Sequence, residues 1–252
     1  MPETLRVCAL YPQLMNIYAD RGNLLFLRRR CEWRGIGFAL HAAELGEPLD
    51  PDAADLFYVG GGQDRDQARC ALDLAEVKRE GLHAAAARGA ALLAVCGGYQ
   101  LLGHSYELGE QTLPGVGLVD LRTVRSDAPR LIGNVAIEVE LDGEPGAGGT
   151  RILAGFENHG GRTHLGPSAE PLGRVLHGHG NNDRDGLEGV KRLNLIGTYL
   201  HGPLLPKNAW LADRLIALAI ERRTGSLPEL EPLEDEFEAA AHDSALRAAS
   251  TG

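Results

Sequence analysis

Apolar and polar positions in the first hundred residues alternate between short apolar runs and longer stretches with helical spacing. Four runs have the length of buried strands: residues 5–10, 36–40, 55–59 and 91–95. Between them, residues 22–34 and 64–88 carry apolar side chains at spacings of three and four, which predicts two helices. Strands that alternate with helices in this way are typical of a mostly parallel sheet.

After residue 109 the pattern changes to strand-like segments separated by turn residues. These segments are residues 116–124, 132–141, 152–156 and 173–176. The loop at residues 142–150 (DGEPGAGGT) is too short for a domain linker, so we expect a β-rich second half of the same domain. Residues 194–200 predict a last buried strand, and residues 208–223 predict a helix.

The predicted fold class is α/β, with an open, mostly parallel sheet, helices on both faces and a β-rich second half. We expect one domain over residues 1–226 and a C-terminal tail over residues 227–252, which is acidic at first and then alanine-rich. A frayed helix, an arm that binds a partner and a disordered segment all fit this tail. A solvated tail is the simplest interpretation.

Composition narrows the classes of function. Of the 252 residues, 44% are hydrophobic and 24% are charged, which excludes disorder as the main property. The formal net charge of -10 argues against a nucleic-acid partner held on a basic face. Residues 89–106 contain no Asp, Glu, Lys or Arg, but glycines and polar residues interrupt them, so we expect no membrane span.

The cysteines indicate a reducing compartment. No CxxC pair occurs and no secretion signal opens the chain, so we expect a cytoplasmic protein with free thiols and no metal site. The four cysteines are Cys8, Cys31, Cys70 and Cys96. The first three lie within strand or helix patterns, which favours a structural role for them.

The fourth cysteine stands in the most informative segment, residues 90–102 (AALLAVCGGYQLL). A buried strand pattern leads to Cys96, the glycines Gly97 and Gly98 follow at once, and a helical pattern begins. The thiol is thereby placed at the carboxyl end of a parallel strand, where ligands bind, and at the N-terminus of a helix. Small neighbours permit the tight turn that exposes a nucleophile, and a helix N-terminus favours the thiolate. Cys96 is therefore the candidate nucleophile.

A thiolate nucleophile needs a base to protonate the leaving group and to activate water. Among nine histidines, His201 has the best context, because it directly follows the strand predicted at residues 194–200 and precedes a Gly-Pro pair. His159 is the rival.

Glycines near these residues offer backbone amides for an oxyanion. The cluster at residues 60–62 follows the strand predicted at residues 55–59, and it lacks the lysine and the Ser or Thr of a Walker A phosphate loop. The candidate oxyanion donors are the amides of Gly61, Gly62 and Gly97.

Three of these motifs together resemble the class I glutamine amidotransferases, in the branch of the cobyric acid and cobyrinic acid synthase glutaminase domains. The motifs are residues 58–64 (YVGGGQD), 95–100 (VCGGYQ) and 199–203 (YLHGP). Within that branch the chain is most similar to the glutaminase subunits of lipid II isoglutaminyl synthases. The signatures are residues 11–12 (YP), 14–23 (LMNIYADRGN), 130–134 (RLIGN) and 156–163 (FENHGGRT). The resemblance spans about residues 5–223.

The resemblance implies that Cys96 attacks the side-chain amide of L-glutamine, that His201 acts as base and then as acid, and that Arg130 binds the glutamine. It also implies that ammonia passes to a MurT-like ligase subunit in a heterodimer. That partner holds ATP and Mg, acts on the D-glutamate of lipid II to give D-isoglutamine, and leaves no cofactor to this chain. Because cobalamin enzymes carry a large ATP-binding domain ahead of the glutaminase, we expect a free-standing subunit here.

One departure from the class I pattern concerns the group that orients His201. Class I enzymes commonly place Glu two residues after the histidine, but Pro203 stands there in this sequence. Asp20 and Glu157 are the candidates for this role, and each also fits a turn or a helix cap. A glutaminase of a cobalamin-type amidotransferase, a cysteine hydrolase of related fold and a non-catalytic binding module are the alternative functions.

Overall fold

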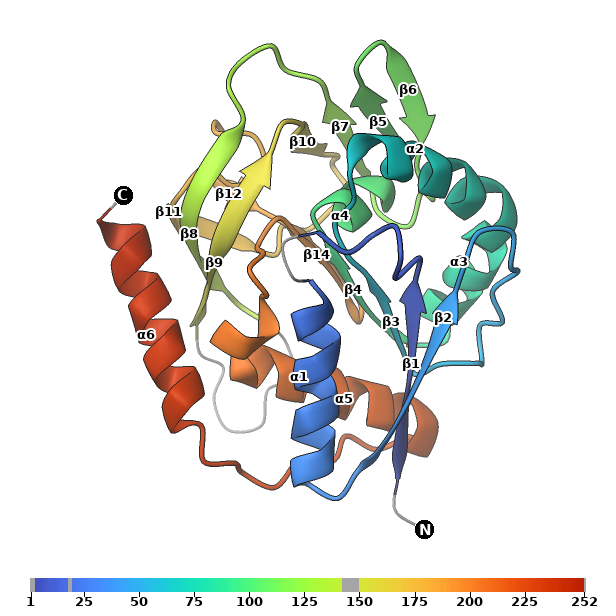
Figure 1. The fold of residues 1–252 in the computed structure, drawn as a ribbon, viewed down its shortest axis with the longest axis vertical. Coiled ribbons are helices and arrows are strands. Elements are labelled where there is room, and N and C mark those ends of the chain that lie inside the picture. The colour runs from blue at the N-terminus through green and yellow to red at the C-terminus, as the bar shows by residue number, and fades with distance from the viewer. Residues whose placement is uncertain (1–2, 18–19, 142–149, 252) are drawn as a thin grey trace.

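The core of the protein is a six-stranded sheet with the order β13-β14-β4-β3-β1-β2 (Figure 1). The computed structural model describes residues 3–17, 20–141 and 150–251. Five strands run parallel: β1 (Thr4–Leu10), β2 (Gly37–Ala43), β3 (Leu56–Val59), β4 (Ala91–Val95) and β14 (Leu195–Thr198). The sixth, β13 (Val190–Arg192), is antiparallel at one edge. The four strands predicted in the first hundred residues and the predicted last strand are confirmed.

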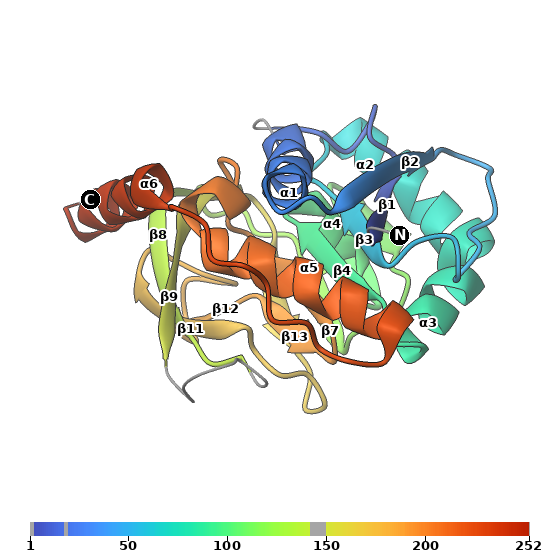
Figure 2. The ribbon, with the colours of Figure 1, turned by 90° about the horizontal axis from the view of Figure 1, so that it is seen from below.

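Helices cover both faces of this sheet. In Figure 2, α1 (Arg21–Trp33) and α5 (Ala209–Thr224) lie on one side and α3 (Arg79–Ala87) lies on the other. The helix predicted over residues 64–88 is divided, because a π-helical turn (Leu74–Lys78) separates α2 (Asp64–Asp73) from α3. Among the described helices, none is long and apolar enough to cross a membrane.

The strand order brings the carboxyl ends of four strands together at one edge of the sheet. From β1, the next strand in the sequence, β2, is added on one side of the sheet, whereas β3 and then β4 are added on the other side. The direction of strand addition therefore reverses at β1, between β1 and β3. Ligands bind at such a switch point, beyond the carboxyl ends of the strands. The segments that follow β1, β3, β4 and β14 all leave the sheet at this edge.

The second half is rich in β structure, as predicted, and forms two further four-stranded sheets. One holds β5 (Ser105–Leu108), β6 (Gln111–Pro114), β7 (Leu121–Val124) and β10 (Arg162–Leu165). The other holds β8 (Leu131–Val139), β9 (Arg151–His159), β11 (Gly173–His177) and β12 (Leu187–Glu188).

Two predictions for this half need correction or lie outside the described chain. The strand predicted over residues 116–124 is a strand only in β7, because the apolar residues before β7 form a buried loop. The amides of this loop bond to the end of the preceding helix, as Val116 N does to Leu101 O (2.9 Å). The loop predicted at residues 142–150 falls, apart from Thr150, outside the described residues.

The C-terminal tail contains a docked helix, α6 (Glu236–Ser250), which packs against β8 and β9 (Figure 1). Its less exposed positions are Glu238, His242, Ala245, Leu246, Ala248 and Ala249. Four of them, Glu238, His242, Ala245 and Ala249, are spaced by four, three and four residues, which places them on one face of the helix. The His242 ring donates to Lys207 O (2.8 Å). The solvated-tail interpretation is therefore wrong for these residues, because alanine-rich helical spacing supplies a flat face that packs on the sheet. The domain division at residue 226 stays a prediction.

Candidate active site

Cys96 stands on a strained turn between β4 and α4 (Gly97–Leu101). Its φ of 51° and ψ of -106° are unusual for a residue with a side chain, and such strain is typical of a nucleophile on a strand-to-helix turn. Its amide donates to Thr198 O (2.8 Å). A side-chain carbon on Gly98 would lie 2.7 Å from Val59 O, so only glycine fits there. The sulfur-bearing residue is 6% exposed, at the edge of the core.

His201 follows β14 and reaches the same site. Its backbone pairs with Phe156 of β9, through His201 N to Phe156 O (2.8 Å) and Phe156 N to His201 O (3.2 Å). Burial of the ring opposes protonation, but the charge of Cys96 and hydrogen bonds with Asp20 and Cys96 raise the pKa of His201 to about 10. The ring is thus an imidazolium at neutral pH, beside the sulfur of Cys96.

Asp20 contacts the His201 ring. Its Oδ1 lies 3.4 Å from His201 Nδ1, and both side chains are fully buried. Asp20 Oδ2 accepts the amide of Gly61 (2.8 Å). The Gly61 amide hydrogen is therefore already bonded to Asp20. For this reason the prediction that Gly61 is an oxyanion donor is wrong for this arrangement.

Pro203 lies against the start of α1, the helix that follows Asp20. A side-chain carbon on Gly22 would lie 2.5 Å from Pro203 Cγ, so the proline ring packs directly against the backbone of Gly22. At the position where class I enzymes commonly carry Glu, this chain thus has a packing contact, and the carboxylate beside His201 is that of Asp20, in the segment after β1.

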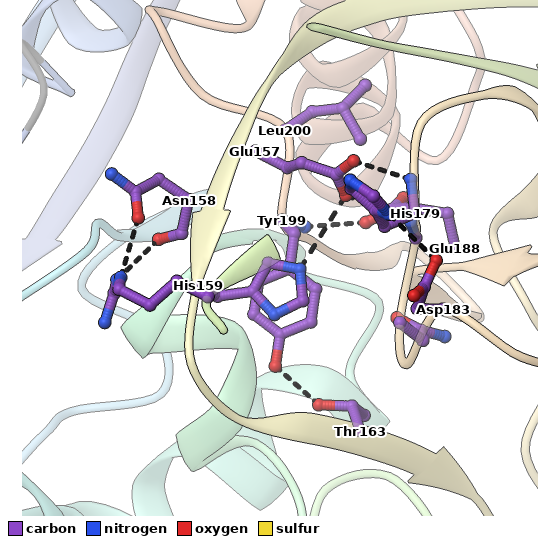
Figure 3. Close-up of polar contacts among 12 residues, drawn as sticks. Glu157, Asn158, His159, Thr163, His179, Asp183, Glu188, Tyr199 and Leu200 are labelled. Atoms are coloured by element: carbon purple, nitrogen blue, oxygen red, sulfur yellow. Dashed lines mark hydrogen bonds and ion pairs between the residues drawn. The ribbon is translucent and has the colours of Figure 1, made fainter. Parts of the chain in front are cut away.

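Glu157, the other candidate for orienting His201, holds different partners (Figure 3). Its carboxylate accepts the amides of His179 (2.6 Å) and Gly180 (3.0 Å) and lies 3.7 Å from His159 Nε2. Glu157 and His159 are two residues apart on β9, so their side chains share one face of the strand. The prediction of Glu157 as the orienting acid is therefore not supported, because its face of β9 is turned toward these amides.

His159, the rival base, is a packed and neutral histidine. Its ring stacks on Tyr199, with centroids 3.5 Å apart and planes at 4°. Burial holds the pKa of His159 below its usual range, and Nδ1 donates to Gly161 O (2.9 Å). These contacts fix the ring in the core, whereas His201 is the histidine beside Cys96.

A buried polar chain beneath Cys96 was missed by the sequence analysis. Gln67 Nε2 donates to Gly97 O (3.3 Å) and to Gln100 Oε1 (2.7 Å). Gln100 Nε2 donates to the Tyr199 hydroxyl (3.0 Å), which also bonds to Thr163 Oγ1 (2.6 Å; Figure 3). This chain of hydrogen bonds connects α2, α4, β10 and the segment after β14. The sequence signal for these hydrogen bonds was a glutamine within a helix pattern that is otherwise apolar.

Glu188 was also missed, and it is a fully buried carboxyl group under the His201 segment (Figure 3). It accepts Tyr199 N (2.7 Å) and contacts Thr198 Oγ1 (3.0 and 3.1 Å). Burial, with a contribution from the charge of Glu157, raises the pKa of Glu188 to about 8, against the lowering by its hydrogen bonds. Glu188 is therefore protonated at neutral pH.

The glycine loop after β3 borders an open pocket of about 590 Å³. Its lining residues are Ile17, Gly62, Gln63, Asp64, Arg65 and Arg130. A side-chain carbon on Gly97 would lie 3.1 Å from the nitrogen of Gly62, so the pocket borders the Cys96 turn. Within the described ranges, no group of three or more His, Cys, Asp or Glu side chains is placed to hold a metal ion.

Arg130 stands at the mouth of this pocket and is exposed. Its Nε donates to Asn158 Oδ1 (2.8 Å) and its Nη2 to Asn158 O (2.9 Å). The guanidinium is therefore held in a fixed orientation at the rim, which suits a group that receives a carboxylate.

Comparison with known proteins identifies relatives along most of the chain. The family model of the CobB/CobQ-like glutamine amidotransferase domain matches residues 6–209. The chain is 41% identical over 226 residues to the subunit GatD of the glutamine-hydrolyzing lipid II isoglutaminyl synthase of Staphylococcus aureus, covering 89% of this chain and 87% of that protein. GatD of Streptococcus pneumoniae is 37% identical over 235 residues, covering 93% and 87%. The cobyric acid synthase of Methylorubrum populi is 30% identical, covering 81% of this chain but 38% of that protein.

Solved structures show the same fold. A chain in a structure of PurLQS from Thermotoga maritima superposes with a TM-score of 0.53 at 20% identity, covering 86% of this chain and 95% of that chain. A glutamine amidotransferase from the same organism gives 0.52 at 15% identity, covering 98% and 96%. These similarities confirm the predicted α/β fold class. With the family model matching most of its length, the chain belongs to the CobB/CobQ-like glutamine amidotransferase domain family.

Proposed function

We propose that this chain is the glutaminase subunit of a lipid II isoglutaminyl synthase. The observation that supports this best is the meeting of Cys96, His201 and Asp20 at one edge of the sheet, in a chain similar to two GatD subunits. In this proposal Cys96 is the nucleophile, His201 the acid and base, and Asp20 the residue that orients His201.

The first half of the reaction forms a thioester. The Cys96 thiolate attacks the side-chain carboxamide carbon of L-glutamine, and the amides of Gly62 and Gly97 receive the oxyanion. The His201 imidazolium gives its proton to the amide nitrogen. The carbon–nitrogen bond then breaks, ammonia leaves, and a glutamyl thioester remains on Cys96.

The second half hydrolyses the thioester. His201, now neutral, takes a proton from water, and the hydroxide attacks the thioester carbon. The carbon–sulfur bond breaks, glutamate leaves, and the thiolate and the imidazolium are restored. Asp20 stabilises each imidazolium form by its negative charge at His201 Nδ1.

The ammonia has a dedicated consumer in this proposal. Free ammonia is protonated and lost in water, so we infer that the chain docks to a MurT-like ligase subunit, which binds ATP and Mg and amidates the D-glutamate of lipid II. All four cysteines are free thiols, which supports a cytoplasmic location. Two purified subunits that fail to co-elute at micromolar concentration would overturn the heterodimer.

Glutamate release from L-glutamine, measured with the ligase present, tests the chemistry. We expect Cys96→Ala to abolish it, and we expect Cys8→Ala, which also removes one buried thiol, to keep it. Release by Cys96→Ala at the wild-type rate would refute the thioester mechanism. Mass spectrometry of stem peptides after depletion of the protein tests the acceptor, because retained D-isoglutamine would contradict lipid II as the substrate of the complex.

A further inference from the structure

The pocket beside Gly62 carries opposite charges on its walls. Asp64 is the first residue of α2, and Arg130 directly precedes β8, so the two come from different parts of the fold. Arg65 also lines the pocket and adds a second positive charge. A cavity lined by both a carboxylate and guanidinium groups suits a ligand that carries both charges, such as an amino acid.

The Asp64 carboxylate has no partner in the described part of the chain. It is exposed, and it makes no hydrogen bond or ion pair there. Asp66, in the same first turn of α2, approaches Arg69 Nη1 at 4.0 Å. Arg130 uses Nε and Nη2 for Asn158, and its remaining nitrogen, Nη1, makes no hydrogen bond to another described residue, which leaves it available to a ligand.

The buried Tyr106 hydroxyl senses both charges and the sulfur. Burial, together with the charges of Asp64 and Cys96, raises the pKa of this hydroxyl to about 12, against the lowering by Arg130. Asp64 and Arg130 therefore act electrostatically on one buried group near Cys96. Because the Gly62 backbone borders both the pocket and the Cys96 turn, a ligand in the pocket would lie next to that turn.

We propose that Asp64 binds the α-ammonium group of L-glutamine, opposite Arg130, to which the family resemblance already assigns glutamine binding, with the side-chain amide directed to Cys96. This inference rests on the proposed function, because it assigns the substrate contacts of that same site. It makes Asp64 the residue that selects a free α-amino acid over other carboxamides. Such selection also protects the thiolate from the amides of peptides, whose α-nitrogen is uncharged.

Binding of L-glutamine to a protein that cannot turn it over tests Asp64 directly. We expect Asp64→Asn, introduced into Cys96→Ser, to weaken glutamine binding about 10- to 100-fold by calorimetry, because a charge-assisted contact is lost. Asp66→Asn in the same background is the matched control and should bind as Cys96→Ser does. Asp64→Glu keeps the charge and should lose less affinity than Asp64→Asn.

A ligand without the α-amino group, glutaramate, completes the test. Cys96→Ser should bind it about as weakly as the double variant binds glutamine, and Asp64→Asn should bring no further loss with glutaramate. Equal glutamine affinity with and without Asp64→Asn would overturn the proposal and leave Asp64 as a helix-start acid. A double variant that still discriminates fully against glutaramate would overturn it as well. Wild-type glutamate release, measured separately, decides the proposed function independently.

Discussion

Replacing Glu188 by Gln should make the protein more stable at alkaline pH than the wild type. Protonated Glu188 accepts Tyr199 N and can donate to Thr198 Oγ1, and a Gln side chain reproduces both bonds with its oxygen and its amide. The substitution therefore imitates the protonated acid and removes the possibility of burying its charge. Because the carbonyl of Thr198 accepts the amide of Cys96, the same contacts hold the nucleophile turn.

The magnitude follows from the pKa of the carboxyl group in the two states. It is 4.5 for an ordinary glutamate and about 8 in the fold, so the folded protein holds one more proton between these values. The contribution of Glu188 to the free energy of unfolding of the wild type therefore falls as pH rises from 4.5 to about 8 and levels off above that. At about 1.4 kcal/mol per pH unit, the full loss is on the order of 5 kcal/mol.

Urea unfolding of wild type and Glu188→Gln between pH 5.5 and 8.5 measures this difference. Subtracting the two curves removes the titration of the other groups that both proteins share. We expect the advantage of the Gln variant to grow by about 1.4 kcal/mol per pH unit up to pH 8. Glu110→Gln, at an exposed position that makes no ion pair within the described residues, is the control and should give a flat difference. A flat difference for Glu188→Gln would refute the reasoning.

Three further predictions concern the nucleophile turn and His201. Asp20→Asn removes a charge that raises the pKa of His201, so the alkaline decline of kcat/KM should move to lower pH; an unchanged decline would contradict the role of Asp20. Cys96→Ala should likewise move the NMR titration of the His201 ring below pH 10, and an unshifted titration would exclude their proximity. Gly98→Ala should lower the free energy of unfolding by about 1–3 kcal/mol in urea, whereas Gly133→Ala, which meets open space, should change it by at most about 0.5 kcal/mol.

The parallel core and the nucleophile turn were predictable because their signals are local. Strand-length apolar runs separated by helical spacing indicate a parallel sheet, and β4 appears at its predicted residues. Gly97 and Gly98 mark the Cys96 turn because the backbone packing there excludes side chains. His201 was found for a similar reason, since it directly follows a buried strand.

Which of the two candidate acids lies beside His201 was not predictable, because this depends on long-range packing. Asp20 and Glu157 are equally plausible from local sequence, and only the position of the segment after β1 and the facing of β9 separate them. Glu188 lies in a strand of two residues, too short for any periodic pattern. The π-helical turn within the predicted helix at residues 64–88 likewise leaves no mark in the spacing of its apolar residues.

The contact between Pro203 and Gly22 ties the position where class I enzymes commonly carry Glu to the helix start that follows Asp20. A glutamate at position 203 would remove the proline ring that packs against the backbone of Gly22, so the change would alter the support of the segment that carries Asp20. Exchanging one source of the carboxylate for the other therefore concerns residues from both ends of the chain.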